Sequence, residues 1–134
     1  MSTFPLEIVT PDRLFLDDEV ERVIVRGAEG DLAILKNRAP LVTPLKIGKI
    51  RVFKDGEEKV ATCVGGYAKV TKEKTTIITD ACEWAEEIDV ERAEEAKKRA
   101  EKRLEKKPEG LDVVRAEAAL KRAINRLDVA KYKK

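Results

Sequence analysis

The chain has 134 residues, of which 43% are hydrophobic and 40% are charged, and its net charge is +2 at pH 7. This length allows one moderate domain or a small domain with an appendage, and the small net charge excludes a strong overall attraction to nucleic acid or membrane. Histidine is absent, and Cys63 and Cys82 have no metal-ligand spacing, so the sequence excludes a zinc site and a histidine-based triad.

The two cysteines favour buried free thiols over a disulfide, because small secreted scaffolds use cysteine far more densely. No apolar run approaches the roughly 18 residues that a membrane-spanning helix needs. The opening residues MSTFPLEIVT lack the charged and apolar regions of a signal peptide. We therefore expect a cytosolic chain whose contact with any membrane is indirect.

The first part of the chain, up to about Ala81, has the hydrophobic period of β-strands. FPLEIVT alternates apolar and polar residues, and VERVIVR is rich in β-branched side chains. KIRVFK and EEKVATCV flank Asp55-Gly56, which is a strong hairpin signal, and a further hairpin is predicted around Lys72 to Lys74. Short strands that recur in this way predict an all-β sandwich or barrel.

From Ile88 onward the hydrophobic period becomes that of helices. Pro108 and Gly110 interrupt this pattern, since a proline and a nearby glycine end one helix and admit another. We therefore predict an α+β fold, with an N-terminal β-sandwich over residues 1–84 and a C-terminal antiparallel two-helix hairpin over residues 85–134.

The predicted hairpin has a weak apolar seam. Alanine contacts bury little area, so the hairpin should be marginally stable and able to rearrange. The first helix has a narrow apolar stripe, formed by Ala93, Ala96, Ala100 and Leu104. The second helix has a broader one, formed by Val113, Ala116, Leu120, Ala123, Ile124 and Leu127.

Similar sequences open both helices, DVERAE from Asp89 and DVVRAE from Asp112. Each aspartate is a candidate helix N-cap. Arg92 then falls at the third helical position, where the positive end of the helix dipole disfavours a cation. A surface pair with Asp89 or Glu95 would explain Arg92, and so would an external anion.

In an antiparallel hairpin, Arg92 lies opposite Arg126, and Arg122 lies within a turn of Arg99. Residues 88–134 carry 15 basic and 10 acidic side chains, whereas residues 1–87 carry 13 and 16. Arginines gathered on a weak hairpin repel one another unless an anion joins them, and guanidinium groups match phosphate oxygens. The chain has neither a phosphate loop nor a dinucleotide fingerprint, so the pattern predicts a phosphate site without naming a nucleotide.

Three stretches of the chain are informative when they are taken together: IVTPDR, then GDLAILKNRAPLVTPLKIGKIRV, then VGGYAKV before TTIITDACEWAEEIDVERA. In this order and spacing they resemble the epsilon subunit of bacterial F-type ATP synthases, over essentially the whole chain. The resemblance implies a β-sandwich followed by two helices, in a non-catalytic subunit of the central stalk. The sandwich would bind the gamma subunit and the membrane rotor ring. The helices would lie folded, or extend toward the alpha and beta subunits and oppose ATP hydrolysis.

The family's ATP-binding motif stands here as Ile88-Asp89-Val90-Glu91-Arg92-Ala93. The resemblance implies that ATP is a regulatory ligand, and it leaves open whether Mg²⁺ accompanies the nucleotide. Asp89, with backbone near Ile88 and Ala93, would recognise adenine. Arg92, Arg99, Arg122 and Arg126 would contact the phosphates and the ribose. Glu83 either belongs to the site or is a solvated carboxylate of the linker. The expected ATP-binding residues are Glu83, Ile88, Asp89, Arg92, Ala93, Arg99, Arg122 and Arg126.

The chain departs from the family at Ala33, Lys36 and Arg38, where many members have Gly, Pro and His. The resemblance therefore does not carry over the detailed contacts of this loop, residues 33–38, with the central shaft of the enzyme. Arg103 and Arg115 are expected to have structural or partner-facing roles. Trp84 is expected to pack between sandwich and hairpin, with adenine stacking as its alternative.

Three alternatives to an ATP-sensing stalk subunit follow from the sequence. The first is a stalk subunit whose hairpin couples without a ligand. The second is a nucleic-acid-binding β-domain with a basic helical tail, for which the scattered aromatics provide a poor stacking platform. The third is an enzyme, for which no catalytic residue or metal site is discernible. We expect no nucleic-acid partner, and a peripheral protein at the cytoplasmic face of the cell membrane that touches the membrane only through the complex.

Overall fold

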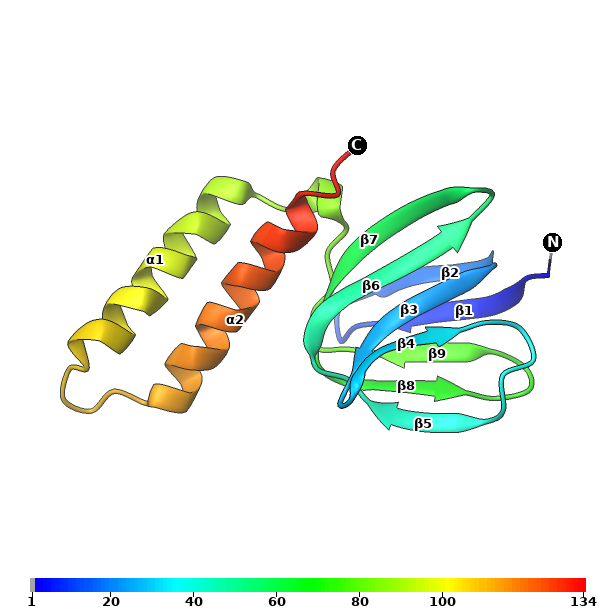
Figure 1. Cartoon of the computed structure of the whole chain (residues 1–134), viewed down its shortest axis with the longest axis horizontal. Coiled ribbons are helices and arrows are strands. Elements are labelled where there is room, and N and C mark those ends of the chain that lie inside the picture. Colours follow the sequence, from blue (N-terminus) through cyan, green and yellow to red (C-terminus); the bar gives the residue numbers. More distant parts are fainter. Residues whose placement is uncertain (1) are drawn as a thin grey trace.

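The chain folds into a β-sandwich with a helical hairpin against its side, as Figure 1 shows. The structure is a computed structural model that describes residues 2–134. Its elements confirm the predicted α+β fold of a sandwich and two C-terminal helices. The strands are β1 (Phe4–Val9), β2 (Leu14–Val20), β3 (Arg22–Gly27), β4 (Gly30–Ile34), β5 (Leu41–Pro44), β6 (Ile47–Lys54), β7 (Glu57–Val64), β8 (Tyr67–Val70) and β9 (Thr75–Ile78).

The strands form two sheets, in the orders β2-β1-β9-β8-β5 and β4-β3-β6-β7. Both predicted hairpins are confirmed, because β6 pairs with β7 and β8 pairs with β9 in antiparallel register. Asp55 and Gly56 have φ values of 53° and 76°, the left-handed conformation that a tight hairpin turn requires. β1 pairs in parallel with β9, which joins the two ends of the sandwich sequence.

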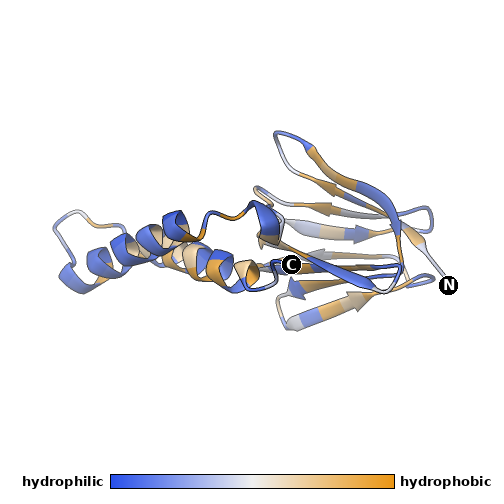
Figure 2. Cartoon of the chain, turned by 90° about the horizontal axis from the view of Figure 1, so that it is seen from above, coloured by the Kyte–Doolittle hydropathy of each residue, from blue (hydrophilic) through white to orange (hydrophobic). Residues whose placement is uncertain are grey.

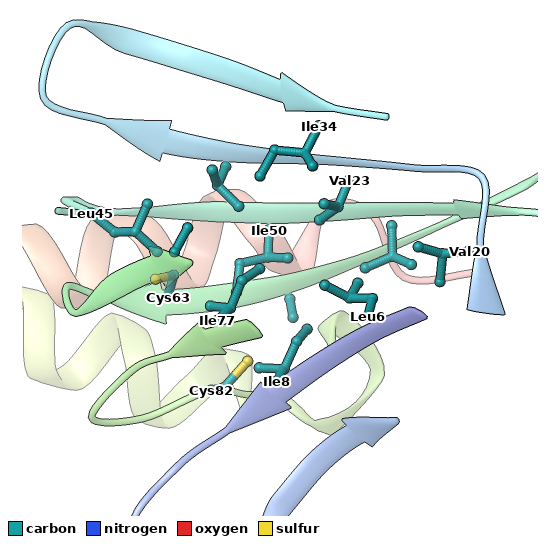
Figure 3. Packing of buried hydrophobic residues seen from close by; sticks show 14 of the residues in the cluster. Leu6, Ile8, Val20, Val23, Ile34, Leu45, Ile50, Cys63, Ile77 and Cys82 are labelled. Carbon is teal, nitrogen blue, oxygen red and sulfur yellow. The ribbon is translucent and has the colours of Figure 1, made fainter. Parts of the chain in front are cut away.

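The main core lies between the two sheets. Leu6, Ile8 and Ile77 from one sheet meet Ile50 from the other, and all four side chains are fully buried, as Figure 3 shows. Successive side chains of a strand point to opposite faces of its sheet, so the alternating apolar residues of these strands face the core, as the sequence predicted.

The two cysteines lie in this core as free thiols, as predicted. Burial raises the pKa of the Cys63 thiol and of the Cys82 thiol. Both thiols therefore stay protonated and poorly reactive at neutral pH.

The hairpin consists of α1 (Val90–Lys106) and α2 (Val113–Ala130), preceded by the short 3₁₀ helix η1 (Ala85–Glu87). Asp89 and Asp112 are the N-caps of α1 and α2, as predicted, and each carboxylate accepts a hydrogen bond of 3.1 Å from a backbone N–H three residues on. No helix among residues 2–134 is long and apolar enough to cross a membrane.

The two helices meet through alanine. Ala93 and Ala100 of α1 and Ala116 and Ala123 of α2 are buried, and Figure 2 shows hydrophilic residues over much of the rest of the hairpin. Val113 and Ile124, which the sequence places on the same stripe, are 42% and 46% exposed and therefore are not part of the buried seam. Small side chains bring the helices close together, so positions beside the seam stay open to solvent.

A second, smaller core joins the hairpin to the sandwich. Ile88 and Ala85 of the linker pack with Val129 and Ala130 of α2 against Val60 of β7. The prediction that Trp84 packs between sandwich and hairpin is wrong. Its ring joins the sandwich core, 4.6 Å from the Phe15 ring, and Ile88 fills the junction instead.

Hydrogen bonds and an ion pair complete the docking of α2. The Asn125 side-chain amide donates to the Gly48 carbonyl at 2.8 Å. The Lys49 ammonium pairs with the Asp128 carboxylate at 3.2 Å. Polar contacts therefore fix α2 along β6, where few apolar side chains meet.

We predict that Gly66→Ala destabilises the sandwich by more than about 2 kcal/mol, because the residue has φ +98° and a Cβ would collide with the Ile78 carbonyl. Urea unfolding followed by circular dichroism measures the change. Gly56→Ala is the matched control, since its φ is also positive but a Cβ there would meet nothing within 4 Å. Equal losses for the two variants would contradict the proposed collision.

Candidate functional site

One face of the hairpin is rich in arginine. Residues three, four or seven apart lie on the same side of a helix, so this spacing aligns arginines along both α1 and α2. We call this surface the arginine face; its members are Arg92, Arg99 and Arg103 of α1 and Arg115, Arg122 and Arg126 of α2.

A groove of about 520 Å³ runs between the helices on this face. Arg99 and Arg103 line it from α1, and Arg115 and Arg122 line it from α2. The structure thus brings two of the predicted site residues, Arg99 and Arg122, to one groove. Sequence reasoning gave Arg103 and Arg115 other roles, although their spacing from Arg99 and Arg122 already placed them on this face.

The groove has an excess of basic side chains, since four arginines and one acidic residue, Asp112, line it. The side chains of Arg99, Arg103, Arg115 and Arg122 are exposed and form no ion pair within residues 2–134. Its floor consists of alanines, which leave the guanidinium groups room to converge on a ligand. An anion with several oxygens would relieve the mutual repulsion of these arginines.

Arg126 differs from the groove arginines because it has a counter-charge. Its guanidinium donates to both carboxylate oxygens of Glu83, at 2.8 and 3.0 Å. The Glu83 backbone is in turn fixed to Thr62 of β7 by hydrogen bonds of 2.8 and 3.0 Å. The alternative of a solvated linker carboxylate for Glu83 is therefore wrong, since this residue ties α2 to the sandwich.

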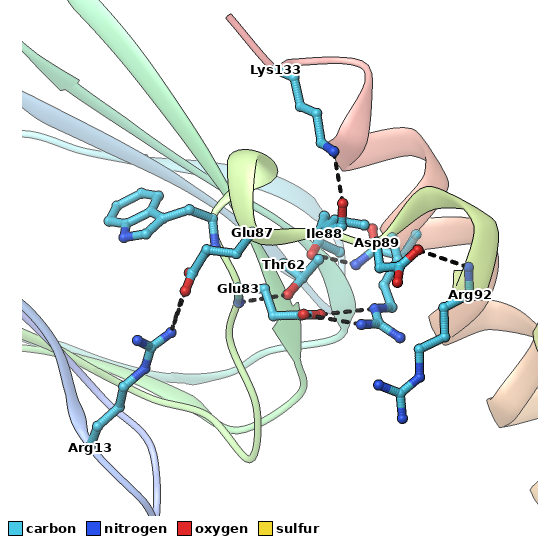
Figure 4. Close-up of polar contacts among 12 residues, drawn as sticks. Arg13, Thr62, Glu83, Glu87, Ile88, Asp89, Arg92 and Lys133 are labelled. Carbon is cyan, nitrogen blue, oxygen red and sulfur yellow. Dashed lines mark hydrogen bonds and ion pairs between the residues drawn. The ribbon is translucent and has the colours of Figure 1, made fainter. Parts of the chain in front are cut away.

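The motif from Ile88 to Ala93 covers the junction of linker and helix, which Figure 4 shows. The Ile88 side chain is buried, and its carbonyl accepts a 2.7 Å hydrogen bond from the Lys133 ammonium. Ala93 is fully buried in the helix seam. Within residues 2–134 the Arg92 guanidinium makes no hydrogen bond, whereas the Arg92 backbone N–H is held by Asp89.

The linker before this motif is fixed on the sandwich side. Arg13 donates to the Glu87 carboxylate at 3.2 Å, and the same carboxylate accepts from the Trp84 backbone N–H at 2.8 Å. Within the described residues, no group of three acidic or cysteine side chains is placed to hold a metal ion.

Comparison with known proteins follows this division into sandwich and helices. The model of the ATP synthase delta/epsilon chain beta-sandwich domain matches residues 3–85, and the model of its long alpha-helix domain matches residues 86–131. The chain belongs to the ATP synthase delta/epsilon chain family. The resemblance found in the sequence is thereby confirmed.

Relatives within this family are similar over most of their length. An ATP synthase epsilon chain of Bacillus velezensis is 51% identical over 130 residues, which cover 97% of this chain and 98% of that one. Another, from Alkaliphilus oremlandii, is 61% identical over 103 residues, or 77% of each chain. A chain of the Euglena gracilis mitochondrial ATP synthase has the same fold, with a TM-score of 0.83 over 98% of this chain and 83% of that one, at 23% identity.

We predict that Glu83→Gln loosens the docking of α2, because it removes the charge from a half-buried, bidentate ion pair that is worth about 1 kcal/mol or more. Backbone hydrogen exchange near Arg126 should become at least about fivefold faster, as that free energy implies. Asp18→Asn is the control, since it breaks the Lys54–Asp18 pair of 2.7 Å on the sandwich. If both variants left the exchange of α2 unchanged, Glu83 would not hold the helix.

Proposed function

We propose that this chain is a non-catalytic subunit of the central stalk of an F-type ATP synthase, and that its folded hairpin binds ATP as a regulatory ligand. The observation that carries the proposal is the groove on the arginine face. It presents Arg99, Arg103, Arg115 and Arg122, which form no ion pair within residues 2–134, on a hairpin whose buried seam residues are alanines.

A nucleotide on this face would use the predicted residues in distinct ways. The triphosphate would lie in the groove against Arg99 and Arg122, where guanidinium groups provide paired N–H donors. Arg92 would add a further cation at the start of α1. Asp89 and the backbone near Ile88 and Ala93 would contact adenine, and Glu83 would hold Arg126 in position toward the ribose.

The energetics favour a switch. A ligand that binds only the folded hairpin stabilises it by RT ln(1 + [L]/Kd), about 2.7 kcal/mol at a hundredfold excess over Kd. An alanine seam contributes little, so this ligand term would be large relative to the stability of the hairpin. At low ATP the basic hairpin would open, extend toward the alpha and beta subunits and oppose ATP hydrolysis.

We predict that the double variant Asp89→Ala, Arg92→Ala abolishes ATP binding by the purified chain, as measured by isothermal titration calorimetry. Titrations with ATP and ADP, each with and without Mg²⁺, define the ligand. Glu105→Ala, Lys106→Ala is the control, because it also removes one acidic and one basic side chain from α1, at exposed positions that do not line the arginine groove. An unchanged affinity of the double variant would overturn the assigned site.

The sandwich offers a surface for the gamma subunit. Strand register aligns a row of apolar residues across the outer face of the five-stranded sheet. Leu14, Tyr67 and Ile78 of this row are 55%, 57% and 51% exposed, which is typical of an interaction surface. The row consists of Leu14, Val9, Ile78, Tyr67 and Pro44. We place the gamma subunit here, with the rotor ring as the second partner at the cytoplasmic face of the membrane.

We predict that Ile78→Asp weakens binding to the purified gamma subunit at least tenfold, because it puts a carboxylate in the centre of the apolar row. Biolayer interferometry measures the affinity. Leu35→Asp is the control, since Leu35 is also 51% exposed but lies beside Phe4 at the start of β1, whereas the row crosses the end of β1. Equal effects of the two substitutions would remove the row from the interface.

A further inference from the structure

The hairpin has a second groove, on the side opposite the arginine face. Ile124 lies two residues from both Arg122 and Arg126, a rotation of about 200° around α2, so it points away from them. Together with Leu127, Val90 of α1 and Ile47 of β6, it lines a hollow of about 750 Å³. Val90 and Ile124 are 37% and 46% exposed, so this apolar surface is uncovered.

The rim of this groove is mostly basic. Lys97, Lys121 and Lys131 stand around it, together with Glu94 and Asp128. The Asp128 carboxylate is already paired with Lys49 at 3.2 Å, on the sandwich side. The charge left for a partner is therefore positive, which favours an occupant with acidic side chains.

The pattern of α2 indicates the shape of the occupant. Ala116 and Ala123 pack on α1, and Leu127 and Ile124 widen the same apolar sector toward the groove. A helix whose apolar sector extends beyond its first neighbour can pack against a second one. The groove follows α2 from Lys121 to Lys131, about 15 Å, which is the length of two to three helical turns.

We propose that this groove binds an amphipathic helix of another protein subunit, whose apolar stripe is flanked by acidic side chains. The helix covers Val90 and Ile124 and sets its carboxylates against the rim lysines. This interface exists in the folded hairpin and completes a three-helix arrangement with α1 and α2. It rests on membership of a multi-subunit assembly and is independent of ATP binding.

Zero-length carbodiimide cross-linking of the assembled ATP synthase that contains this chain, followed by mass spectrometry, tests the proposal. The Lys49–Asp128 pair provides an internal reporter, because these two groups are in contact only while α2 is docked. When the Lys49–Asp128 cross-link shows that α2 is docked, we expect cross-links from the rim lysines to carboxylates on a helix of another subunit. The rim lysines are Lys97, Lys121 and Lys131. These links should be at least tenfold more frequent than links from Lys102 and Lys106, lysines of α1 outside the groove.

Two variants make the test specific. Ile124→Asp should reduce the rim-lysine links at least tenfold and leave the Lys49–Asp128 link intact. Val114→Asp is the control, because Val114 is 76% exposed on the same helix but does not line the groove. The proposal is overturned if the rim lysines link no more often than Lys102 and Lys106, if their targets are not helical, or if Ile124→Asp changes nothing. An occupant without carboxylates, such as a detergent or lipid, gives no such links and also overturns it.

Discussion

The docking of α2 on β6 and β7 is the contact on which the rest of the molecule depends. It combines a small apolar cluster around Ile88 and Val129 with polar links through Asn125 and Arg126. Within residues 2–134, α1 has no comparable contact with the sandwich and is held mainly by α2. Whatever loosens α2 therefore releases the whole hairpin, and whatever bridges the two helices strengthens both.

The hairpin balances weak attraction against electrostatic repulsion. Alanines at the seam allow close approach but bury little area, while the arginine face gathers like charges. Glu83 neutralises one of these arginines from the sandwich side and leaves the groove arginines unpaired within residues 2–134. The two surfaces of the hairpin thus differ in chemistry: one suits a polyanion, and the other suits an apolar surface with acidic edges.

Local features of the fold could be predicted from sequence, because they depend on neighbouring residues. The turn at Asp55-Gly56 and the caps at Asp89 and Asp112 are examples. The parallel pairing of β1 with β9 and the Glu83–Arg126 ion pair could not, since they join residues that are distant in the sequence. Helical spacing predicted that arginines gather on one face of the hairpin, but only the packing shows that Ile124 is 46% exposed.

The anchored linker has a mechanical consequence. Contacts of Glu83 with Thr62 and of Glu87 with Arg13 make the chain up to Glu87 part of the sandwich. A swing of the hairpin therefore pivots at Ile88 and Asp89, directly before α1. With 17 residues, α1 is a rigid arm of about 25 Å, so a rotation of about 30° at this pivot displaces its tip by about 13 Å. A change in two backbone torsions is thereby amplified into a movement larger than the width of a helix.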